Sequence, residues 1–366
     1  MQITAAVTPG KSEAFVIETI ELEEPRPDEV RVKVVATGLC HTDLVVRDQY
    51  YPTPLPAVLG HEGAGIVDAV GSAVTKVKPG DPVVLSYKAC GACHSCKEGE
   101  QAYCLDLFAQ NFAGRRADGS TPFKRNGEPI SGMFFAQSSF ANFALAHETN
   151  VVKVREDAPL ELLGPLGCGV QTGAGAVMNT LNPRAGSSIA VFGAGSVGLS
   201  AVMAAYAVGC TTIIAVDPNE SRRALAKELG ATHTIDPTTD DPVEAIKAIT
   251  GTGAFFSLET SSLPKVFRQA VDCLTLRGVC GLIGAAPLGT EVSFDMNEIL
   301  FGRTIRGVIE GDSVPDIFIP RLVELFMQGR FPLDRLTKKY PLDQINQAAA
   351  DSEAGTTIKP ILVMPH

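Results

Sequence analysis

The pattern of hydrophobic and polar positions changes character about halfway along the chain. Up to about Val170, segments such as residues 29–36 and 64–70 alternate apolar and polar side chains between turns rich in proline, glycine and aspartate. This alternation is typical of β-strands with one buried face. Residues 107–129 are polar and weakly periodic, so we expect a long surface loop there.

After Val170, short apolar runs alternate with helical stretches. In order, the expected elements are residues 189–192, 196–208, 212–216, 220–229, 243–249 and 255–258. Gly209 and Gly230 follow two of the helical stretches, where glycine commonly ends a helix. Strands that alternate with helices predict a parallel sheet covered by helices on both faces.

The tail that follows the alternating region carries an amphipathic helix, at about residues 319–328, and a final strand at residues 360–364. We expect this tail to fold back onto the first domain. The pattern therefore predicts an α/β protein of two domains. Residues 1–170 and 304–366 form a β-rich domain, and residues 171–303 form a doubly wound parallel-sheet domain.

Composition and charge exclude several classes of partner. The 366 residues are 45% hydrophobic and 20% charged, with a formal net charge of −10, so nucleic-acid binding is not expected. The apolar runs are too short to span a membrane, and the first residues do not resemble a secretory signal. Nine cysteines in such a chain indicate metal ligands or free thiols, and a reducing cytoplasm is the expected location.

A glycine-rich turn, Gly193-Ala194-Gly195-Ser196-Val197-Gly198, lies between an expected strand and an expected helix. In that context Gly193 suits a tight turn, Gly195 allows the backbone to approach a pyrophosphate, and Gly198 allows close packing of helix and strand. The alternative is a turn that serves packing alone. We expect the amides of residues 193–198, including those of Ser196 and Val197, to bind a dinucleotide.

Asp217 ends the strand that follows this turn and helix. A carboxylate at that place accepts hydrogen bonds from the adenosine ribose and repels a 2′-phosphate. Arg222 and Arg223 are close in sequence and would suit NADP, but they begin a helix several residues later. The sequence therefore favours NAD.

Four cysteines follow the spacing Cys90-x2-Cys93-x2-Cys96-x7-Cys104. Four thiolates on a turn-rich segment suit one closed tetrahedral zinc site, which leaves no position for a substrate. Disulfide bonds are the alternative, and a reducing location argues against them. We expect a structural zinc ion.

A second group of zinc ligands begins with Cys40 and His61, with Asp43 and Glu62 beside them. A catalytic zinc site needs three protein ligands and an open fourth position. Cys168 is the third candidate because it lies at the junction of the two domains. The other cysteines, Cys210, Cys273 and Cys280, fall in the alternating region, where a small buried thiol is the expected role.

These features resemble the zinc-dependent medium-chain alcohol dehydrogenases along nearly the whole chain. The resemblance rests on Gly60-His61-Glu62, the four cysteines, the glycine-rich turn and the domain order. Residues 38–43, 134–140 and 162–168 are also similar to bacterial aryl-alcohol (benzyl-alcohol) dehydrogenases. The fold implied is a GroES-like catalytic domain and a Rossmann domain.

The resemblance also implies roles for individual residues. It implies that Cys40, His61 and Cys168 bind catalytic zinc, that Glu62 lies in or near the zinc shell, and that Asp43 lies behind His61. It further implies Thr42 as the hydroxyl that takes the alcohol proton, His41 and Lys359 at the cofactor pyrophosphate, and Arg222 beside the ribose. One departure is Val45, where several relatives carry a histidine that ends a proton relay. His41 is the alternative proton carrier, and a purely electrostatic contact with the pyrophosphate is its other possible role.

The expected function is oxidation of an aromatic or allylic primary alcohol to the aldehyde, with hydride transfer to NAD and two zinc ions per chain. A terpene alcohol of the geraniol type and a thiol adduct of formaldehyde are alternative substrates. A non-enzymatic member of the superfamily is an alternative of another class. We expect a homodimer or homotetramer, for which the apolar residues 304–309 offer an edge strand.

Overall fold

The computed structural model describes residues 1–365, and its contacts divide the chain into two units. The first unit comprises Met1–Gly169, Val314–Met327 and Leu333–His366, and the second comprises Val170–Ser313 and Gln328–Pro332. The sequence pattern placed a boundary at residue 303, whereas the contact division falls at Ser313. The difference arises because β16 still pairs with β15 of the parallel sheet.

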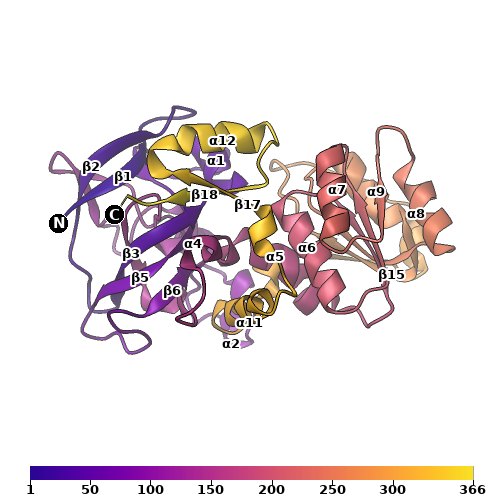
Figure 1. The fold of residues 1–366 in the computed structure, drawn as a ribbon, viewed down its shortest axis with the longest axis horizontal. Coiled ribbons are helices and arrows are strands. Elements are labelled where there is room, and N and C mark those ends of the chain that lie inside the picture. The colour runs from indigo at the N-terminus through magenta and orange to yellow at the C-terminus, as the bar shows by residue number, and fades with distance from the viewer. Residues whose placement is uncertain (366) are drawn as a thin grey trace. The chain divides into compact units, whose positions relative to one another are not determined.

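The first unit contains two sheets (Figure 1). One has the order β4-β1-β2-β7-β8, formed by β1 (Gln2–Thr8), β2 (Val16–Leu22), β4 (Ala57–Val58), β7 (Phe123–Arg125) and β8 (Glu128–Ile130). The other has the order β10-β6-β5-β3-β18-β17, and β9 also pairs with β3. Its strands are β3 (Glu29–Gly38), β5 (Glu62–Val70), β6 (Pro82–Leu85), β9 (Phe143–His147), β10 (Val151–Lys153), β17 (Thr337–Pro341) and β18 (Lys359–Val363).

Strand β3 shows why these residues form a sheet with one buried face. Val30, Val32 and Val34 are buried, whereas Arg31 and Lys33 between them are partly or fully exposed. Because side chains alternate faces along a strand, the three valines enter the core of this unit together. Alternating burial in β3 therefore follows the alternation in the sequence.

The last strand of the chain, β18, pairs antiparallel with β3 in the register Ile361 to Gly38 and Leu362 to Thr37. Figure 1 shows the yellow β18 beside the indigo β3. This pairing brings the C-terminal strand beside β3, whose end at Gly38 faces Glu62 at the start of β5. The helices of the unit are α1 (His41–Arg47), α2 (His94–Lys97), α3 (Leu107–Phe112), α4 (Leu160–Leu163), α11 (Pro315–Met327) and α12 (Ile345–Glu353).

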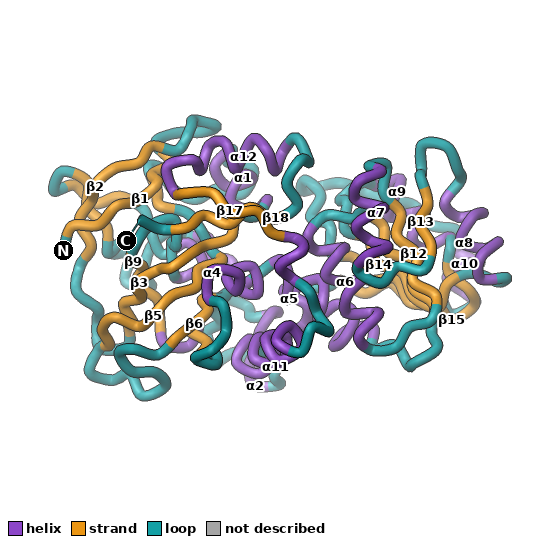
Figure 2. The backbone as a smooth tube through the Cα atoms, in the orientation of Figure 1, coloured by secondary structure: helices purple, strands orange, loops and turns teal. Residues whose placement is uncertain are grey.

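The second unit is built on a parallel sheet with the order β13-β12-β11-β14-β15-β16. Its strands are β11 (Ser188–Phe192), β12 (Thr212–Val216), β13 (His233–Ile235), β14 (Ala254–Glu259), β15 (Leu274–Leu282) and β16 (Thr304–Gly307). Figure 2 shows these strands in orange among the helices α5 (Gly169–Gly175), α6 (Ser196–Ala207), α7 (Glu220–Glu228), α8 (Pro242–Thr250), α9 (Pro264–Asp272) and α10 (Met296–Leu300). The strand order is that of a Rossmann fold, which binds ligands where the order reverses, here at β11 and β14.

The expectation of a long loop at residues 107–129 was wrong. The segment contains helix α3 and the hairpin of β7 and β8, which extends the first sheet. Its polar composition concealed these elements, because much of its anchoring comes from charged groups. Arg116 donates to both carboxylate oxygens of Glu29 on β3 at 2.6 and 2.9 Å and to Glu23 at 3.0 Å.

No helix within residues 1–365 combines the length and the apolar character that a membrane span requires.

We predict that Arg116→Leu destabilises the protein, because it leaves the Glu29 carboxylate, whose side chain is 5% exposed, without its ion-pair partner. Loss of one member of a buried pair costs about 3–5 kcal/mol, and we expect the lower end, since the pair lines an open cavity of about 420 Å³. The free energy of unfolding in urea measures the effect. The control is Arg115→Leu, because Arg115 is exposed and, within residues 1–365, donates to a backbone carbonyl, that of Gly119, rather than to a carboxylate. If the two variants had the same free energy of unfolding, the ion pair of Arg116 with Glu29 would not stabilise the fold.

Candidate active site and metal centres

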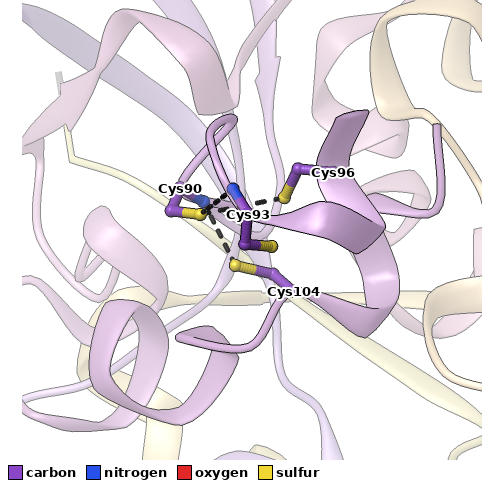
Figure 3. Close-up of side chains that lie close together, drawn as sticks. All are labelled: Cys90, Cys93, Cys96 and Cys104. Atoms are coloured by element: carbon purple, nitrogen blue, oxygen red, sulfur yellow. Dashed lines mark hydrogen bonds between the residues drawn. The ribbon is translucent and has the colours of Figure 1, made fainter. Parts of the chain in front are cut away.

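The four cysteines of the predicted structural site converge in space (Figure 3). Cys90, Cys93, Cys96 and Cys104 place their sulfur atoms within 4.8 Å of one another, and all four are free thiols. Cys93 precedes α2 and Cys96 lies within it, so a single helical turn presents two of the sulfurs.

Backbone amides point at the sulfurs of this group. The amide of Cys90 donates to Sγ of Cys104 at 3.3 Å, and the amide of Cys93 donates to Sγ of Cys90 at 3.3 Å. Hydrogen bonds from the amides of Leu105 and Cys96 lower the pKa of the Cys93 thiol to about 6. Burial instead raises the pKa of the Cys96 and Cys104 thiols, so the amides favour the thiolate at Cys93 in particular. Four cysteine sulfurs in a compact group fit a closed zinc site.

The second predicted group also comes together. Ligand atoms of Cys40, His61, Glu62 and Cys168 lie within 4.8 Å of one another. Cys40 precedes α1 and follows β3, His61 directly precedes β5, and Cys168 follows the turn Gly164–Gly167. Because Gly38 of β3 faces Glu62 of β5 in the sheet, the first two ligand segments are neighbours by strand register.

Asp43 connects these segments. Its Oδ2 accepts from the amide of Cys40 at 2.9 Å, and its Oδ1 accepts from the amide of Gly60 at 3.1 Å and lies 2.8 Å from Nδ1 of His61. All of Asp43 and His61 is buried. The contact with Asp43 fixes Nδ1 as the protonated nitrogen, so the lone pair of Nε2 is available for a metal.

His61 Nε2 provides the test of whether a metal fits. This buried atom makes no hydrogen bond to any residue of the described chain. A buried nitrogen left without a partner is costly, whereas a zinc ion held with the neighbouring thiolates would satisfy it. The donor set of two thiolates and one imidazole therefore fits a catalytic type of zinc site.

Glu62 lies beside this group and pairs with Lys359. The ammonium of Lys359 donates to both carboxylate oxygens of Glu62 at 2.9 and 3.0 Å, and the amide of Gly169 donates to one of them at 3.0 Å. Burial alone would lower the pKa of Lys359. The Glu62 carboxylate outweighs burial, so the pKa of Lys359 is raised. Sequence reasoning missed this pair. The role of Lys359 at a pyrophosphate stays a prediction.

The ring of His61 also has two aromatic neighbours. Phe135 stacks on it with a centroid distance of 4.5 Å, and Phe134 meets it edge-on at 5.4 Å. The backbone of this segment is left-handed at Met133, Phe135, Ala136 and Ser138. Left-handed backbone costs a residue with a Cβ about 1–2 kcal/mol, so tertiary contacts must hold these residues in place.

The residues predicted to handle protons lie on helix α1. Thr42 Oγ1 is 3.9 Å from Sγ of Cys40, and His41 is the exposed first residue of the helix. Val45 follows Thr42 on the same helix, and its side chain has no group that can carry a proton. The structure thus places Thr42 next to the Cys40 ligand segment.

The glycine-rich turn connects β11 to α6 at the carboxyl end of the parallel sheet. Gly193 has a left-handed backbone with φ +95°, and a Cβ on Gly198 would overlap the carbonyl oxygen of Gly193. By contrast, nothing lies within 4 Å of the place where a Cβ on Gly195 would be. The open face at Gly195 and the start of α6 at Ser196 and Val197 fit a bound pyrophosphate.

Asp217 follows β12 and has a second task besides the predicted contact with the ribose. Its Oδ2 accepts from the amide of Ala194 at 2.7 Å, and its Oδ1 accepts from the amide of Asn219 at 2.8 Å. The carboxylate therefore braces the glycine-rich turn. Arg222 places Nη1 4.0 Å from the same carboxylate.

Comparison with protein families matches both parts of the chain. Residues 26–156 match the alcohol dehydrogenase GroES-like domain, and residues 196–327 match the zinc-binding dehydrogenase domain. Among characterised relatives, a geraniol dehydrogenase of Castellaniella defragrans is 47% identical over 362 residues, which cover 98% of this chain and 97% of that one.

Two solved structures are similar over their whole length. The benzyl alcohol dehydrogenase of Acinetobacter calcoaceticus is 53% identical, with a TM-score of 0.97 and full coverage of both chains. An alcohol dehydrogenase zinc-binding domain protein of Burkholderia ambifaria is 60% identical, with a TM-score of 0.99 and the same coverage. With this fold and two groups of zinc-type ligands, the chain belongs to the zinc-dependent medium-chain alcohol dehydrogenases.

Proposed function

We propose that this alcohol dehydrogenase oxidises aromatic or allylic primary alcohols to aldehydes with NAD as the hydride acceptor. The observation that carries the proposal is the similarity along the full chain to a benzyl alcohol dehydrogenase and a geraniol dehydrogenase. Benzyl alcohol and geraniol share a primary alcohol next to an unsaturated carbon. A thiol adduct of formaldehyde lacks that feature.

Cys40, His61 and Cys168 would hold the catalytic zinc ion, and residues 193–198 with Asp217 would hold the cofactor. The chemistry that the two bound groups supply is polarisation of the alcohol hydroxyl and acceptance of a hydride from its carbon. Asp43 keeps the His61 ring oriented, and Thr42 relays the alcohol proton: Oγ1 accepts it while the Thr42 hydroxyl gives its own proton to the next acceptor.

The proton must then leave Thr42 without help from Val45. His41, exposed at the start of α1, is one candidate acceptor, and the cofactor ribose and water are the others. His41 and Lys359 are also the residues proposed to contact the pyrophosphate, and Arg222 the residue beside the ribose. Glu62 stays near the zinc shell, paired with Lys359.

The four cysteines at Cys90, Cys93, Cys96 and Cys104 would bind a second zinc ion with a structural role. This closed shell leaves no coordination position for an alcohol. We also propose that β16 pairs with a second copy in a homodimer or homotetramer. It is the terminal strand of its sheet, and all four of its residues are exposed.

The substrate proposal predicts a strong preference for benzyl alcohol and geraniol over ethanol in steady-state kinetics with NAD. Each buried CH₂ contributes about 0.8 kcal/mol and about 1.4 kcal/mol changes a rate tenfold, so we expect at least an about 100-fold difference in kcat/KM. Cys168→Ala should lose turnover on all three alcohols but retain NAD binding. Similar kcat/KM for ethanol and benzyl alcohol would refute the substrate class, and normal turnover of Cys168→Ala would remove Cys168 from the site.

The structural zinc proposal predicts that Cys93→Ser lowers the zinc content from two ions per chain to one. Thermal stability should fall, because a closed zinc site contributes folding free energy. Elemental analysis and calorimetry measure the two effects. Cys210→Ser is the control, since this buried cysteine lies in the second unit, outside both ligand groups, and should leave two zinc ions. A Cys93→Ser protein with both metals and unchanged stability would show that the group is not a zinc site.

Asp217 is predicted to determine the choice of cofactor. Asp217→Ser removes the carboxylate that repels a 2′-phosphate while Arg222 remains close, so the ratio of kcat/KM for NADP to that for NAD should rise about tenfold or more. Asp240→Ser, which changes an exposed carboxylate before α8, should leave the ratio unchanged. A wild-type enzyme that already prefers NADP would be incompatible with this role.

A further inference from the structure

The left-handed segment 133–138 and the two residues after it are fastened to the segment that carries His61. The hydroxyl of Ser138 donates to the carbonyl of Val58 at 2.7 Å. The amide of Phe140 donates to Leu59 at 3.0 Å, and the amide of Ser139 donates to Gly60 at 2.9 Å. The acceptors are the consecutive residues Val58, Leu59 and Gly60, which directly precede His61. The two segments therefore form one rigid layer.

Gln137 extends this layer past His61. Its amide nitrogen donates to the carbonyl of His61 at 2.9 Å and to the carbonyl of Ser86 at 3.2 Å, and its amide oxygen accepts from Gly63 at 3.1 Å. Gln137 is fully buried. A Cβ on Gly63 would lie 3.2 Å from the Gln137 amide oxygen and 2.8 Å from the Ser139 side chain, so this contact requires glycine.

Ser86 carries the connection to the third ligand segment. Its hydroxyl donates to the carbonyl of Gly167 at 2.8 Å, directly before Cys168. A Cβ on Gly167 would overlap the carbonyl of Leu85, so strand β6 and the Cys168 segment are in backbone contact. Gln137 and Ser86 together therefore join the backbone at His61 to the backbone at Cys168.

We propose that Gln137 is a positioning residue, which sets the distance between His61 and Cys168 through its side-chain amide. The proposal rests on the proposed catalytic zinc site, and all the residues concerned lie in the first unit. A metal site tolerates ligand displacements of only about 0.5 Å, so a group that spans two ligand segments controls its geometry. Asp43 connects Cys40 and His61 in the same way, because its carboxylate contacts the amide of Cys40 and the ring of His61.

Asn150 explains how the segment keeps its unfavourable backbone. Its amide nitrogen, which is fully buried, lies 3.2–3.3 Å from the carbonyl oxygens of Ser86, Phe135 and Ala136. The left-handed residues and Ser86 are thereby held by a common donor. The strained conformation brings Phe135 onto the His61 ring and places the Gln137 amide between His61 and Ser86.

The test is Gln137→Met, which keeps the length of the side chain but removes all three hydrogen bonds. Cobalt(II) replaces zinc in the full-length protein, and the visible spectrum separates a site of two thiolates and one imidazole from a site of four thiolates. We expect the bands of the first site to shift, and its cobalt affinity, measured by competition with a chelator, to fall about 10–100-fold. The bands of the four-cysteine site should not move.

Asn111→Leu is the matched control. Asn111 is also fully buried and also makes three hydrogen bonds to backbone, but its partners are Lys88 and Leu107. A merely structural role of Gln137 predicts similar losses of Tm and unchanged cobalt bands of the first site in both variants. That result, or an equal shift of those bands in the control, overturns the proposal.

A second variant covers the case in which Gln137→Met does not fold. Ser86→Ala removes the hydroxyl that donates to Gly167, and the same bands should shift in the same direction by a smaller amount. Unchanged bands would overturn the proposal. The wild-type spectrum separates this inference from the proposed function. If wild-type protein lacks the bands of the first site, both fail together, whereas wild-type bands with unchanged variants reject the role of Gln137 alone.

Discussion

The candidate metal site of the first unit depends on the buried carboxylate of Asp43. A carboxylate without contact with water is stable only if its oxygens are occupied by hydrogen-bond donors or balanced by positive charge. Asp43 meets that condition with the amides of Cys40 and Gly60 and with the ring of His61. The same three contacts position the thiol of Cys40 and the imidazole of His61, so the groups that stabilise this one charge also form two sides of the candidate metal site.

The remaining side is built by polar contacts of the same kind. Hydrogen bonds of Gln137 and Ser86 connect the backbone at His61 to the backbone directly before Cys168. Lys359 forms an ion pair with Glu62 beside them. The four-cysteine group is simpler, because a single short segment supplies every ligand and backbone amides point at the sulfurs. One group thus needs several distant parts of the chain, whereas the other is nearly local. This difference agrees with one group serving chemistry and the other serving stability.

The sequence predicted those features that depend on neighbouring residues. Hydrophobic runs placed β11 and β12 within a residue of their bounds, and glycine spacing identified the turn before α6. Contacts between distant residues could not be predicted in this way. Residues 107–129 lack the apolar pattern of helices and strands because the ion pair of Arg116 with Glu29 anchors them, so the sequence predicts a loop there. Lys359 and Glu62 are 297 residues apart. The left-handed backbone near Phe135 is imposed by tertiary contacts, since none of its four left-handed residues is glycine.

The positions of the zinc ions can be measured directly in a crystal structure of the zinc-loaded protein with anomalous diffraction at the zinc absorption edge. We expect two zinc peaks in each chain. One should lie among the four sulfurs of the Cys90–Cys104 segment at about 2.3 Å from each, and the other about 2.3 Å from the sulfurs of Cys40 and Cys168 and about 2.0–2.1 Å from Nε2 of His61. A single peak, or a second zinc ion that does not contact Nε2 of His61, would contradict this expectation.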